Sequence, residues 1–527
     1  MNYLQKKKLA FMSIVNSVKG FIRTITGVFP LTLTNCVDEE SITDYTIYGN
    51  SVQDGTPTPD NPIEVESVGE KTRNLLRLCR DGETINLAGV KFVVNKDVGI
   101  TMKGTATGDT VIDVSKDNGF TAGGGTYTLC GCFGGSKSTY YLQTQNGFTD
   151  TGRGVTVSEK EDKNIVRLYV KKGTVLDNVT ICPMLIKGNY VGKVPDYEPY
   201  GYKIPVTVSG KNLFDIDKAE IGSMHDSHGG NLERDNRVRT NYIYVKAGTY
   251  CVSTISTSGG VRSSTICHAY STPLETTHIG AVNATSGTIL TGTKAYSIFT
   301  ILVDCYVRFL FLPMSDSSIT DLNTNTLNDF KPQIERGDMP TDYEPYHEPI
   351  TTNIYLDEPL RKIGDYADYI DFEKGKVVRN VGKYTFTGNE TDMGGSADDT
   401  ACVGYVVHIS GLSLTNYKRG LCKHVPVYTY VAQLGNSRLA FHTAANHPYC
   451  YVFFKKADFP DLTAKQITKQ MYDSGNPLVL YYNRNAPTET PITSSNIPTF
   501  RGTSILNADT TIQPSNAEVT YYSTLKG

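Results

Sequence analysis

One five-residue motif, Asp-Tyr-Glu-Pro-Tyr, occurs twice in this sequence, at residues 196–200 and at residues 342–346. The two occurrences start 146 residues apart, which is the size of one compact domain. Three other short matches precede them in the same order: RNLL at 73–76 with KNLF at 211–214, GTY at 125–127 with GTY at 248–250, and MLIKG at 184–188 with QIERG at 333–337. Four matches in one order predict that the chain contains two copies of a single domain.

Apolar residues alternate with other residues inside each predicted copy, which is the period of a strand with one buried face. The alternating sets are Val90, Phe92 and Val94, then Val166, Leu168 and Val170, and in the second copy Val307, Phe309 and Phe311. Glycine occurs 48 times and tyrosine 34 times, while tryptophan is absent, a balance typical of many short strands joined by tight turns. The sequence therefore predicts a mainly β chain whose copies, residues 73–208 and 209–354, are antiparallel β-sandwiches of the jelly-roll kind.

The first 28 residues carry a long helical pattern. Apolar residues recur at three- and four-residue steps between residues 4 and 25, at Phe11, Ile14, Val15, Val18, Phe21, Ile22 and Ile25. We expect an amphipathic docking helix over residues 1–28 that packs on a partner subunit or on the chain itself, and a helix on a membrane surface is the alternative. Three lysines before the apolar run resemble a secretory signal, but Asn16 and Lys19 interrupt that run, so we expect the segment to be retained.

Three prolines, Pro57, Pro59 and Pro62, lie close together in the stretch YGNSVQDGTPTPDNPIEVESVGE, residues 48–70. Proline fixes its own φ angle and keeps the preceding residue extended. The stretch therefore predicts a strand and a nearly straight, semi-rigid spacer over residues 29–72, which would hold the two copies away from the N-terminal helix.

After the second copy, the sequence predicts a third β-rich module at residues 355–490 and C-terminal strands at residues 491–527. Residues 368–388 have the pattern of a hairpin with its turn at residues 373–375. Residues 463–472 have the pattern of the one short helix of this module. The C-terminal stretch is expected to form two strands.

The overall composition argues against several classes of protein. Lysine and arginine number 51 against 54 acidic residues, a formal charge of -3, which gives no broad basic field for a nucleic acid. No run of 18 apolar residues occurs, so we expect no membrane insertion. The 11 cysteines are scattered and odd in number, which argues against a disulfide framework or a zinc site and fits synthesis in a reducing cytoplasm.

Several residue groups are candidates for a catalytic or metal site. Asp365, Asp368 and Asp371 are the densest set of acids, but beside a predicted hairpin we expect them to be solvated turn residues rather than a glycosidase pair. His225 and His228 lie in a Gly-rich stretch, which predicts a loop and not a metal-binding helix face. The stretch TAGGGT, residues 121–126, precedes a strand, so it predicts a turn and not a phosphate loop. Neither a nucleophile elbow nor an activated cysteine is evident, and we expect no enzyme activity, no catalytic residue, no cofactor and no metal.

Binding of a sugar is a further possibility, because flat aromatic faces hold sugar rings. The candidate side chains are Tyr140, Tyr141, Tyr242, Tyr244, Tyr428, Tyr430, Tyr449 and Tyr451. Each has a structural alternative, since a tyrosine on a strand commonly packs in the sandwich with its hydroxyl at the rim. The sequence does not choose among them, so the ligand-binding residues stay unknown at this point.

Four stretches resemble minor structural, tail-fibre and baseplate-associated proteins, including receptor-binding proteins, of phages and prophages of Gram-positive bacteria. They are the proline-containing stretch at 48–70, KNLFD at 211–215, LRKIGDYADYIDFEKGKVVRNV at 360–381, and the segment from NPLVLYYNRNAPTETPI to IQPSNAEVTYYS at 476–523. The stretch RNLLRLCR at 73–80 is a looser match than KNLFD. The resemblance marks an architecture and supplies no fixed binding residues.

The resemblance implies a virion component, synthesised in the cytoplasm of the bacterial host, whose modules are similar to carbohydrate-binding jelly rolls and face the host surface. The expected function is host attachment through a cell-surface glycan by a tail, fibre or baseplate protein. The expected partners are other virion proteins, reached through the N-terminal helix, and further copies of the chain, most simply in a trimer, because weak sugar sites gain from multivalent display. The alternative is a purely structural virion adaptor, or a capsid decoration or head-fibre protein, without receptor binding.

Overall fold

The computed structural model describes residues 46–120, 125–157, 164–255, 260–284, 289–291, 294–315, 317–371, 374–394, 400–413, 419–429, 435–442, 447–492, 502–509 and 518–525. In these residues the chain is mainly β, with many small antiparallel sheets and few helices. Their helices are all too short or too polar to cross a bilayer. The predicted amphipathic helix at residues 4–25 lies outside the described residues.

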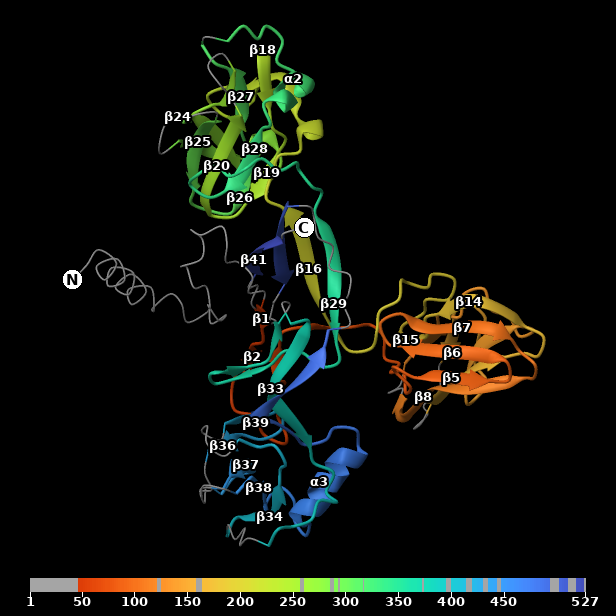
Figure 1. Cartoon of the computed structure of the whole chain (residues 1–527). Helices are drawn as coiled ribbons and strands as arrows, with labels where there is room; N and C mark the ends of the chain where they lie inside the picture. The colour runs from red at the N-terminus through yellow and green to blue at the C-terminus, as the bar shows by residue number, and fades with distance from the viewer. Residues whose placement is uncertain are drawn as a thin grey trace.

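Copy 1, defined here as residues 73–200, forms the orange and yellow lobe of Figure 1. Its strands are β5 (Thr84–Leu87), β6 (Val90–Asn95), β7 (Gly99–Thr105), β8 (Thr110–Phe120), β9 (Tyr127–Cys130), β10 (Tyr140–Thr144), β11 (Thr149–Asp150), β12 (Val155–Val157), β13 (Asn164–Val170), β14 (Val175–Ile181) and β15 (Met184–Lys187). They form three sheets, ordered β14-β7-β6-β5, β11-β10-β13-β8 and β12-β9-β15. Residues from all three sheets, including Phe92, Leu129 and Leu168, belong to one buried apolar cluster.

Copy 2, residues 211–346, forms the green lobe at the top of Figure 1. Its elements are the 3-10 turn η2 (Ile216–Lys218), β17 (Glu220–His225), β18 (Asn231–Arg239), β19 (Ile243–Val245), β20 (Gly248–Ile255), β21 (Val261–Ser263), β22 (Ile266–Tyr270), η3 (Glu275–Thr277), β23 (His278–Asn283), β24 (Ile289–Thr291), β25 (Lys294–Ile301), β26 (Cys305–Arg308), β27 (Leu310–Pro313), α2 (Thr324–Asp329) and β28 (Gln333–Arg336). Its sheets run β17-β18-β27-β21, β19-β26-β22-β23 and β24-β25-β20-β28. They too share one apolar cluster, which includes Phe214, Val252 and Phe309.

The two copies match in strand order and in register. Strands β13 and β15 of copy 1 take the same places in their sheets as β26 and β28 take in copy 2, whereas β14 is an edge strand beside β7 and its counterpart β27 pairs with both β18 and β21. The strand that begins with the GTY motif pairs with the last strand in the same register, Tyr127 opposite Lys187 and Tyr250 opposite Arg336. The nine residues of the predicted alternating sets are all at most 3% exposed, which confirms the alternation as the signal of buried strand faces.

A third sheet system, called the hub here, joins segments that are far apart in the chain. Its strands are β1 (Thr46–Tyr48), β2 (Ser51–Val52), β3 (Glu66–Ser67), β4 (Glu70–Lys71), β16 (Tyr202–Gly210), β29 (Ile350–Leu356), β30 (Lys362–Ile363), β31 (Tyr366–Ala367), β32 (Tyr369–Asp371), β40 (Gly502–Asp509) and β41 (Glu518–Leu525). Copy 1 lies between the paired strands β4 and β16, and copy 2 lies between the paired strands β16 and β29. Each copy is therefore an insertion between two neighbouring strands of the hub.

The stretch with three prolines does not form the predicted straight spacer. Strands β2 and β3 on either side of it pair antiparallel, and the backbones of Thr58 and Asn61 exchange two hydrogen bonds of 3.1 Å. The Gln53 side chain donates to the backbone oxygens of Ile63 (2.9 Å) and Cys422 (2.8 Å), which holds the loop on the third module. Proline restricts single dihedral angles, but the flanking strands can still pair and reverse the chain.

The third module, at the bottom of Figure 1, contains β33 (Lys376–Thr385), β34 (Cys402–His408), β35 (Gly420–Cys422), β36 (Val427–Tyr428), β37 (Arg438–Phe441), β38 (Tyr449–Lys455), α3 (Ala464–Asp473) and β39 (Val479–Pro491). The predicted hairpin is confirmed, since β32 pairs with β33 and Asp371 lies opposite Lys376. The predicted helix is confirmed within one residue, and Thr463 and Gln466 form its capping box. The two predicted C-terminal strands pair as β40 and β41, and β40 joins the hub beside β16.

Candidate functional site

The first and last repeat motifs of copy 2 meet at the side chain of Asn212. Its Nδ2 donates to the backbone oxygens of Pro332 (3.2 Å) and Glu344 (3.1 Å). Its Oδ1 accepts from the backbone nitrogens of Phe214 and Ile334, both at 3.1 Å. Asn212 is buried and uses its full donor and acceptor capacity, so it locks the KNLF segment onto strand β28 and onto the DYEPY segment.

Copy 1 contains the same arrangement around Asn74. Its Nδ2 donates to the backbone oxygens of Pro183 (3.4 Å) and Glu198 (2.9 Å). Its Oδ1 accepts from the backbone nitrogens of Leu76 (2.9 Å) and Leu185 (3.1 Å). The four partners occupy the positions of the four partners in copy 2, which explains why the two motifs recur together.

A basic residue next to each asparagine pairs with the glutamate of DYEPY. Arg73 contacts both carboxylate oxygens of Glu198 at 3.2 Å, and Lys211 lies 3.0 Å from Glu344. Burial raises the pKa of Glu198, but hydrogen bonds from Arg73 and Lys203 lower it more, so the net pKa lies below its usual range. In each copy this ion pair therefore joins the same two segments that the asparagine side chain joins through uncharged hydrogen bonds; the asparagine and its four bonds are called the clamp below.

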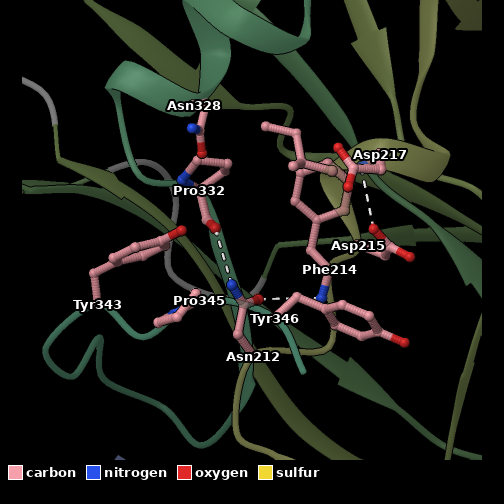
Figure 2. A pocket seen from close by; sticks show the side chains of 10 residues that line it. Asn212, Phe214, Asp215, Asp217, Asn328, Pro332, Tyr343, Pro345 and Tyr346 are labelled. Carbon is pink, nitrogen blue, oxygen red and sulfur yellow. Dashed lines mark hydrogen bonds between the residues drawn. The ribbon is translucent and has the colours of Figure 1, made fainter. Parts of the chain in front are cut away.

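Copy 2 forms an open hollow of about 170 Å³ where these motifs meet (Figure 2). Its lining comes from the KNLFD segment, the start of η2, the end of α2 and the DYEPY segment: Asn212, Phe214, Asp215, Ile216, Asp217, Asn328, Pro332, Tyr343, Pro345 and Tyr346. Drug-sized ligands occupy pockets of about 300–1,000 Å³. The hollow therefore has room for one small ring, such as a single sugar residue.

Two tyrosine rings and two carboxylates define the chemistry of the hollow. Figure 2 shows Tyr343 on the left of the hollow, Asp215 and Asp217 on the right, and Tyr346 at the lower right. The Asp215 side chain accepts from the backbone nitrogen of Asp217 at 3.1 Å, which caps η2 and fixes the acidic turn. Aromatic faces beside fixed hydrogen-bond acceptors suit a polar ring that carries hydroxyl groups.

Charged groups hold Tyr346 in place. Its hydroxyl donates to Glu348 at 3.0 Å, and the Lys218 ammonium lies 2.9 Å from Asp215 and 3.1 Å from Glu348. Burial, with a further effect of Glu348, raises the pKa of Tyr346 to about 12, so its hydroxyl remains a donor at neutral pH. Burial also raises the pKa of Tyr343. Both rings are therefore neutral aromatic surfaces under ordinary conditions.

Copy 1 fills the corresponding position differently. The hydroxyl of Tyr197, the counterpart of Tyr343, donates to the backbone oxygen of Lys96 at 2.6 Å. Arg77 stands where copy 2 has Asp215, and Pro199 is buried whereas Pro345 is exposed. The shared motif thus builds the same clamp in both copies, but the tyrosine and acidic walls of the hollow belong to copy 2.

The three predicted acids do not lie together as solvated turn residues. Asp365 is exposed as predicted, but Asp368 is fully buried and accepts from the backbone nitrogens of Arg361 (3.1 Å) and Val381 (2.8 Å) and from Arg379 (3.2 Å). Asp371 is buried too and accepts from the backbone and ammonium nitrogens of Lys374, both at 2.9 Å. The prediction of solvated acids was wrong for Asp368 and Asp371: the Asp368 carboxylate satisfies buried backbone donors, and the buried Asp371 carboxylate fixes the turn through Lys374.

The other predicted candidates do not form a reactive site in the described residues. His228 is exposed in a turn, as expected, whereas His225 is buried against His268, with ring centroids 4.4 Å apart. Burial raises the pKa of Cys130 and Cys132 to about 12 each, so neither is an activated thiol. Residues 121–124 of the glycine stretch lie outside the described residues. Within the described ranges, the structure groups no three His, Cys, Asp or Glu side chains as metal ligands.

The tyrosines considered from sequence are mostly packed, and Tyr430 lies outside the described residues. Tyr140 and Tyr141 are buried, and Tyr141 stacks on Tyr169 at 4.9 Å. Those of copy 2 and the third module contact neighbouring rings: Tyr242 with Tyr270 (5.0 Å), Tyr244 with Tyr306 (5.4 Å), Tyr449 with His447 (5.4 Å) and Tyr451 with Phe453 (5.9 Å). Tyr428 packs partly buried beside Tyr451. None of them lines the hollow.

Tyr343 and Tyr346, which do line the hollow, lie inside the motif that the sequence marks as a repeat. The repeated DYEPY motif is the sequence signal that could have pointed to these two tyrosines. They stand on either side of Glu344, whose backbone is bonded to Asn212. The molecule is thus a mainly β protein with two inserted copies of one module and a polar-aromatic hollow in the second copy. Searches for similar proteins matched no family model, no curated protein and no solved structure.

Proposed function

We propose that this chain is a bacteriophage virion protein of the tail, fibre or baseplate, and that its modules attach to a glycan of the host surface. The two copies act as β-sandwich modules of the jelly-roll kind, and the N-terminal helix docks the chain on other virion proteins. The resemblance to phage structural proteins supports the location, and the duplicated β modules support the display role. The chain binds its ligand and does not cleave it.

The observation that carries the binding role is the hollow of copy 2. Two tyrosine rings, the fixed carboxylate of Asp215, the carboxylate of Asp217 and the exposed Asn328 meet in a space sized for one ring. A site of this size gives modest affinity, because it buries little surface. A terminal or branch sugar of a wall polysaccharide is the class of ligand that fits.

The architecture supports repeated display of such a weak site. Both copies enter and leave through paired strands of one hub, so the hub presents them on short connections. Assembly into a homo-oligomer, most simply a trimer, multiplies the number of hollows that face the same surface. Linked weak sites bind together more tightly by about two to four orders of magnitude than one site alone.

Adsorption of the full-length protein tests the proposal. We expect binding to a subset of Gram-positive bacteria and to their purified wall polysaccharides, and we expect the double variant Tyr343→Ala and Tyr346→Ala to lose it. A variant that lacks residues 1–28 should still bind cells but should no longer join the virion. Adsorption no higher than that of an unrelated β-sandwich protein would instead favour the purely structural adaptor. Equal binding of the wild type and the double variant would show that the hollow is not the binding site, and release of reducing sugar would revive a hydrolase.

A further inference from the structure

Three histidine rings form a continuous chain in copy 2, called the histidine cluster here: His225, His268 and His278. The centroids of His225 and His268 lie 4.4 Å apart, and those of His268 and His278 lie 5.0 Å apart. Nδ1 of His268 and Nε2 of His278 share a hydrogen bond of 2.9 Å. His225 is 7% exposed and His268 is 6% exposed, and in the described residues neither ring nitrogen of His225 has a hydrogen-bond partner.

The cluster lies between a hairpin and the sheet beneath it. His225 is the last residue of β17, whereas His268 lies on β22 and His278 begins β23. The turn at residues 226–230 that joins β17 to β18 therefore rests on the β22–β23 pair. The Tyr270 hydroxyl donates to the backbone oxygen of Gly229 at 2.6 Å, and the Glu275 carboxylate accepts from the backbone nitrogen of Asn231.

Gly229 shows how closely the turn sits on the sheet. Its backbone has a φ angle of +79°, which favours glycine, and a Cβ atom at this position would collide with the His278 ring. The turn is thus fastened by one tyrosine, one glutamate and one histidine from the sheet side. The turn keeps these contacts only while Tyr270, Glu275 and His278 stay in these positions.

The charged groups around the cluster are mostly positive. Arg239 on β18 and Arg308 on β26 are both buried and share the two oxygens of Glu220 on β17. The other acidic groups nearby, Asp226 in the turn and Glu275 on η3, are exposed. The arginines therefore disfavour any further positive charge in the cluster, and the exposed acids offset this less because water screens them.

We propose that the turn of the β17–β18 hairpin is an acid-released clasp, which opens when the histidine cluster takes up protons. In the closed form the rings of His225 and His268 are buried near Arg239 and Arg308, so a proton on either ring would add like charge without a buried counterion of its own. In the open form the rings reach water and bind protons as ordinary histidines do. Acid therefore favours the open form.

The direction of the pKa shifts agrees with this geometry. Burial, followed by the effects of His268, Arg239 and Arg308, lowers the pKa of His225 to about 2, and burial, followed by His278, lowers that of His268 to about 4. These pKa values lie below that of a free histidine, about 6.5. The stability of the closed form is therefore fully present above that pH and decreases as the pH falls. Between its lowered pKa and about pH 6.5, each of His225 and His268 raises the equilibrium constant for opening by about tenfold for every pH unit of acidification.

Opening would expose the face of the sheet under the hairpin, where Tyr242, Tyr270 and Arg308 lie. The Arg308 guanidinium stacks 4.4 Å from the centroid of Tyr242, and Tyr242 packs edge-on against Tyr270. Copy 1 has no histidine between residues 73 and 200, so its hairpin of β6 and β7 lacks this device. The same molecule therefore contains an internal control.

Hydrogen exchange on the full chain tests the clasp, with rates corrected for the intrinsic effect of pH. Between about pH 6.5 and about pH 4.5 we expect the opening equilibrium of residues 224–231 to rise by about a hundredfold or more in the wild type, while residues 90–105 of copy 1 show no comparable change. The variant His268→Phe should reduce the rise by about the factor that one histidine contributes, and His408→Phe, at an exposed position of the third module, should retain the full rise. Unchanged protection in the wild type, or a full rise in His268→Phe, would overturn the proposal.

A second variant guards against misfolding. If His268→Phe exposes copy 2 already at neutral pH, His278→Phe serves instead, because His278 is only half-buried and contacts the turn directly. The near-ultraviolet spectrum at neutral pH should match the wild type for whichever variant is used. An acid response of His278→Phe equal to that of the wild type would also contradict the clasp.

Discussion

The side-chain amide of Asn212 donates to the backbone oxygen of Glu344 across 132 positions of the chain at 3.1 Å. This bond closes copy 2, because it joins the first segment of the copy to its last segment. The equivalent bond from Asn74 to Glu198 closes copy 1 at 2.9 Å. In each copy, one asparagine therefore bonds the segment that comes from the hub to the segment that returns to it.

Replacement of Asn212 by alanine should destabilise copy 2 by about 3 kcal/mol, because it leaves two backbone donors and two backbone acceptors without their partners in a buried place. The chain has several separate cores, so a local measurement is needed. Hydrogen exchange of the amides in β28 should report the loss, and those in β15 of copy 1 should not change. Asn74→Ala should give the reverse pattern.

Asn328→Ala is the matched control, since Asn328 also lines the hollow but is exposed. Its effect on exchange in β28 should stay within about 0.5 kcal/mol. An effect of Asn328→Ala as large as that of Asn212→Ala would show that the hollow, rather than the clamp, closes the copy.

Glu198 should make the stability of copy 1 depend on acid. Its pKa is lowered in the folded chain, because the hydrogen bonds from Arg73 and Lys203 outweigh burial. Its contribution is therefore full above the unfolded pKa of about 4.3 and is lost as the pH falls through the folded pKa. Exchange in β15 should show Glu198→Gln less stable than the wild type at neutral pH, with a difference that shrinks below about pH 4.

Glu83→Gln provides the comparison for this pH profile. Glu83 pairs with Arg80 at 3.2 Å, but the Glu83 side chain is 53% exposed. Exposed pairs contribute little, so the variant should follow the wild-type profile at every pH. A constant difference between Glu198→Gln and the wild type down to strongly acid pH would contradict a role for the carboxylate charge.

Local patterns explain why much of the fold could be predicted. Val90, Phe92 and Val94 alternate because one face of β6 is buried, and Thr463 predicts the start of α3 because its side chain caps the first turn. The strand pairing of the hub has no comparable local pattern in the sequence. Its strand β16 pairs with β40, about 300 residues further along the chain, and nothing in either short segment specifies that partner. The proline-containing loop was mistaken for a spacer for the same reason.

Only part of the candidate site could be predicted from the sequence. The DYEPY motif and its asparagine partner could be found as repeats, but the side chains around the motif differ between the copies, and the hollow described here is lined by copy 2. The difference depends on Tyr197, which bonds to the backbone of Lys96, and on Arg77 in place of Asp215. These contacts come from packing between distant segments, so residue types alone do not reveal them.

Asp368 should be needed for the connection between the hub and the third module. Its carboxylate is fully buried and accepts from two backbone nitrogens and from Arg379. Removal of the carboxylate in Asp368→Ala leaves the buried backbone nitrogens of Arg361 and Val381 without their acceptor, which costs about 3 kcal/mol. Hydrogen exchange in β33 should detect this loss. Asp365→Ala, three residues earlier and exposed, should change it by less than about 0.5 kcal/mol.

The tyrosines of the hollow should determine glycan affinity. Tyr343→Ala and Tyr346→Ala each remove one aromatic face, and each should weaken binding to a purified wall polysaccharide by about tenfold, or about 1.4 kcal/mol. Tyr200→Ala in copy 1 removes the counterpart of Tyr346, which is 39% exposed there, and should leave affinity unchanged. Calorimetric titration of the full chain, with exchange in β28 as a check on folding, measures both.

Tyr346→Phe separates the ring from its hydroxyl. The ring should still pack against the sugar, while the hydrogen bond to Glu348 is lost, so we expect a loss of only about twofold to threefold at neutral pH. Burial keeps the pKa of Tyr346 near 12, so the wild type should bind equally well up to about pH 9. If Tyr346→Phe loses as much affinity as Tyr346→Ala, then the hydroxyl and not the aromatic face recognises the ligand, and the hollow is a hydrogen-bonding site instead of a stacking one.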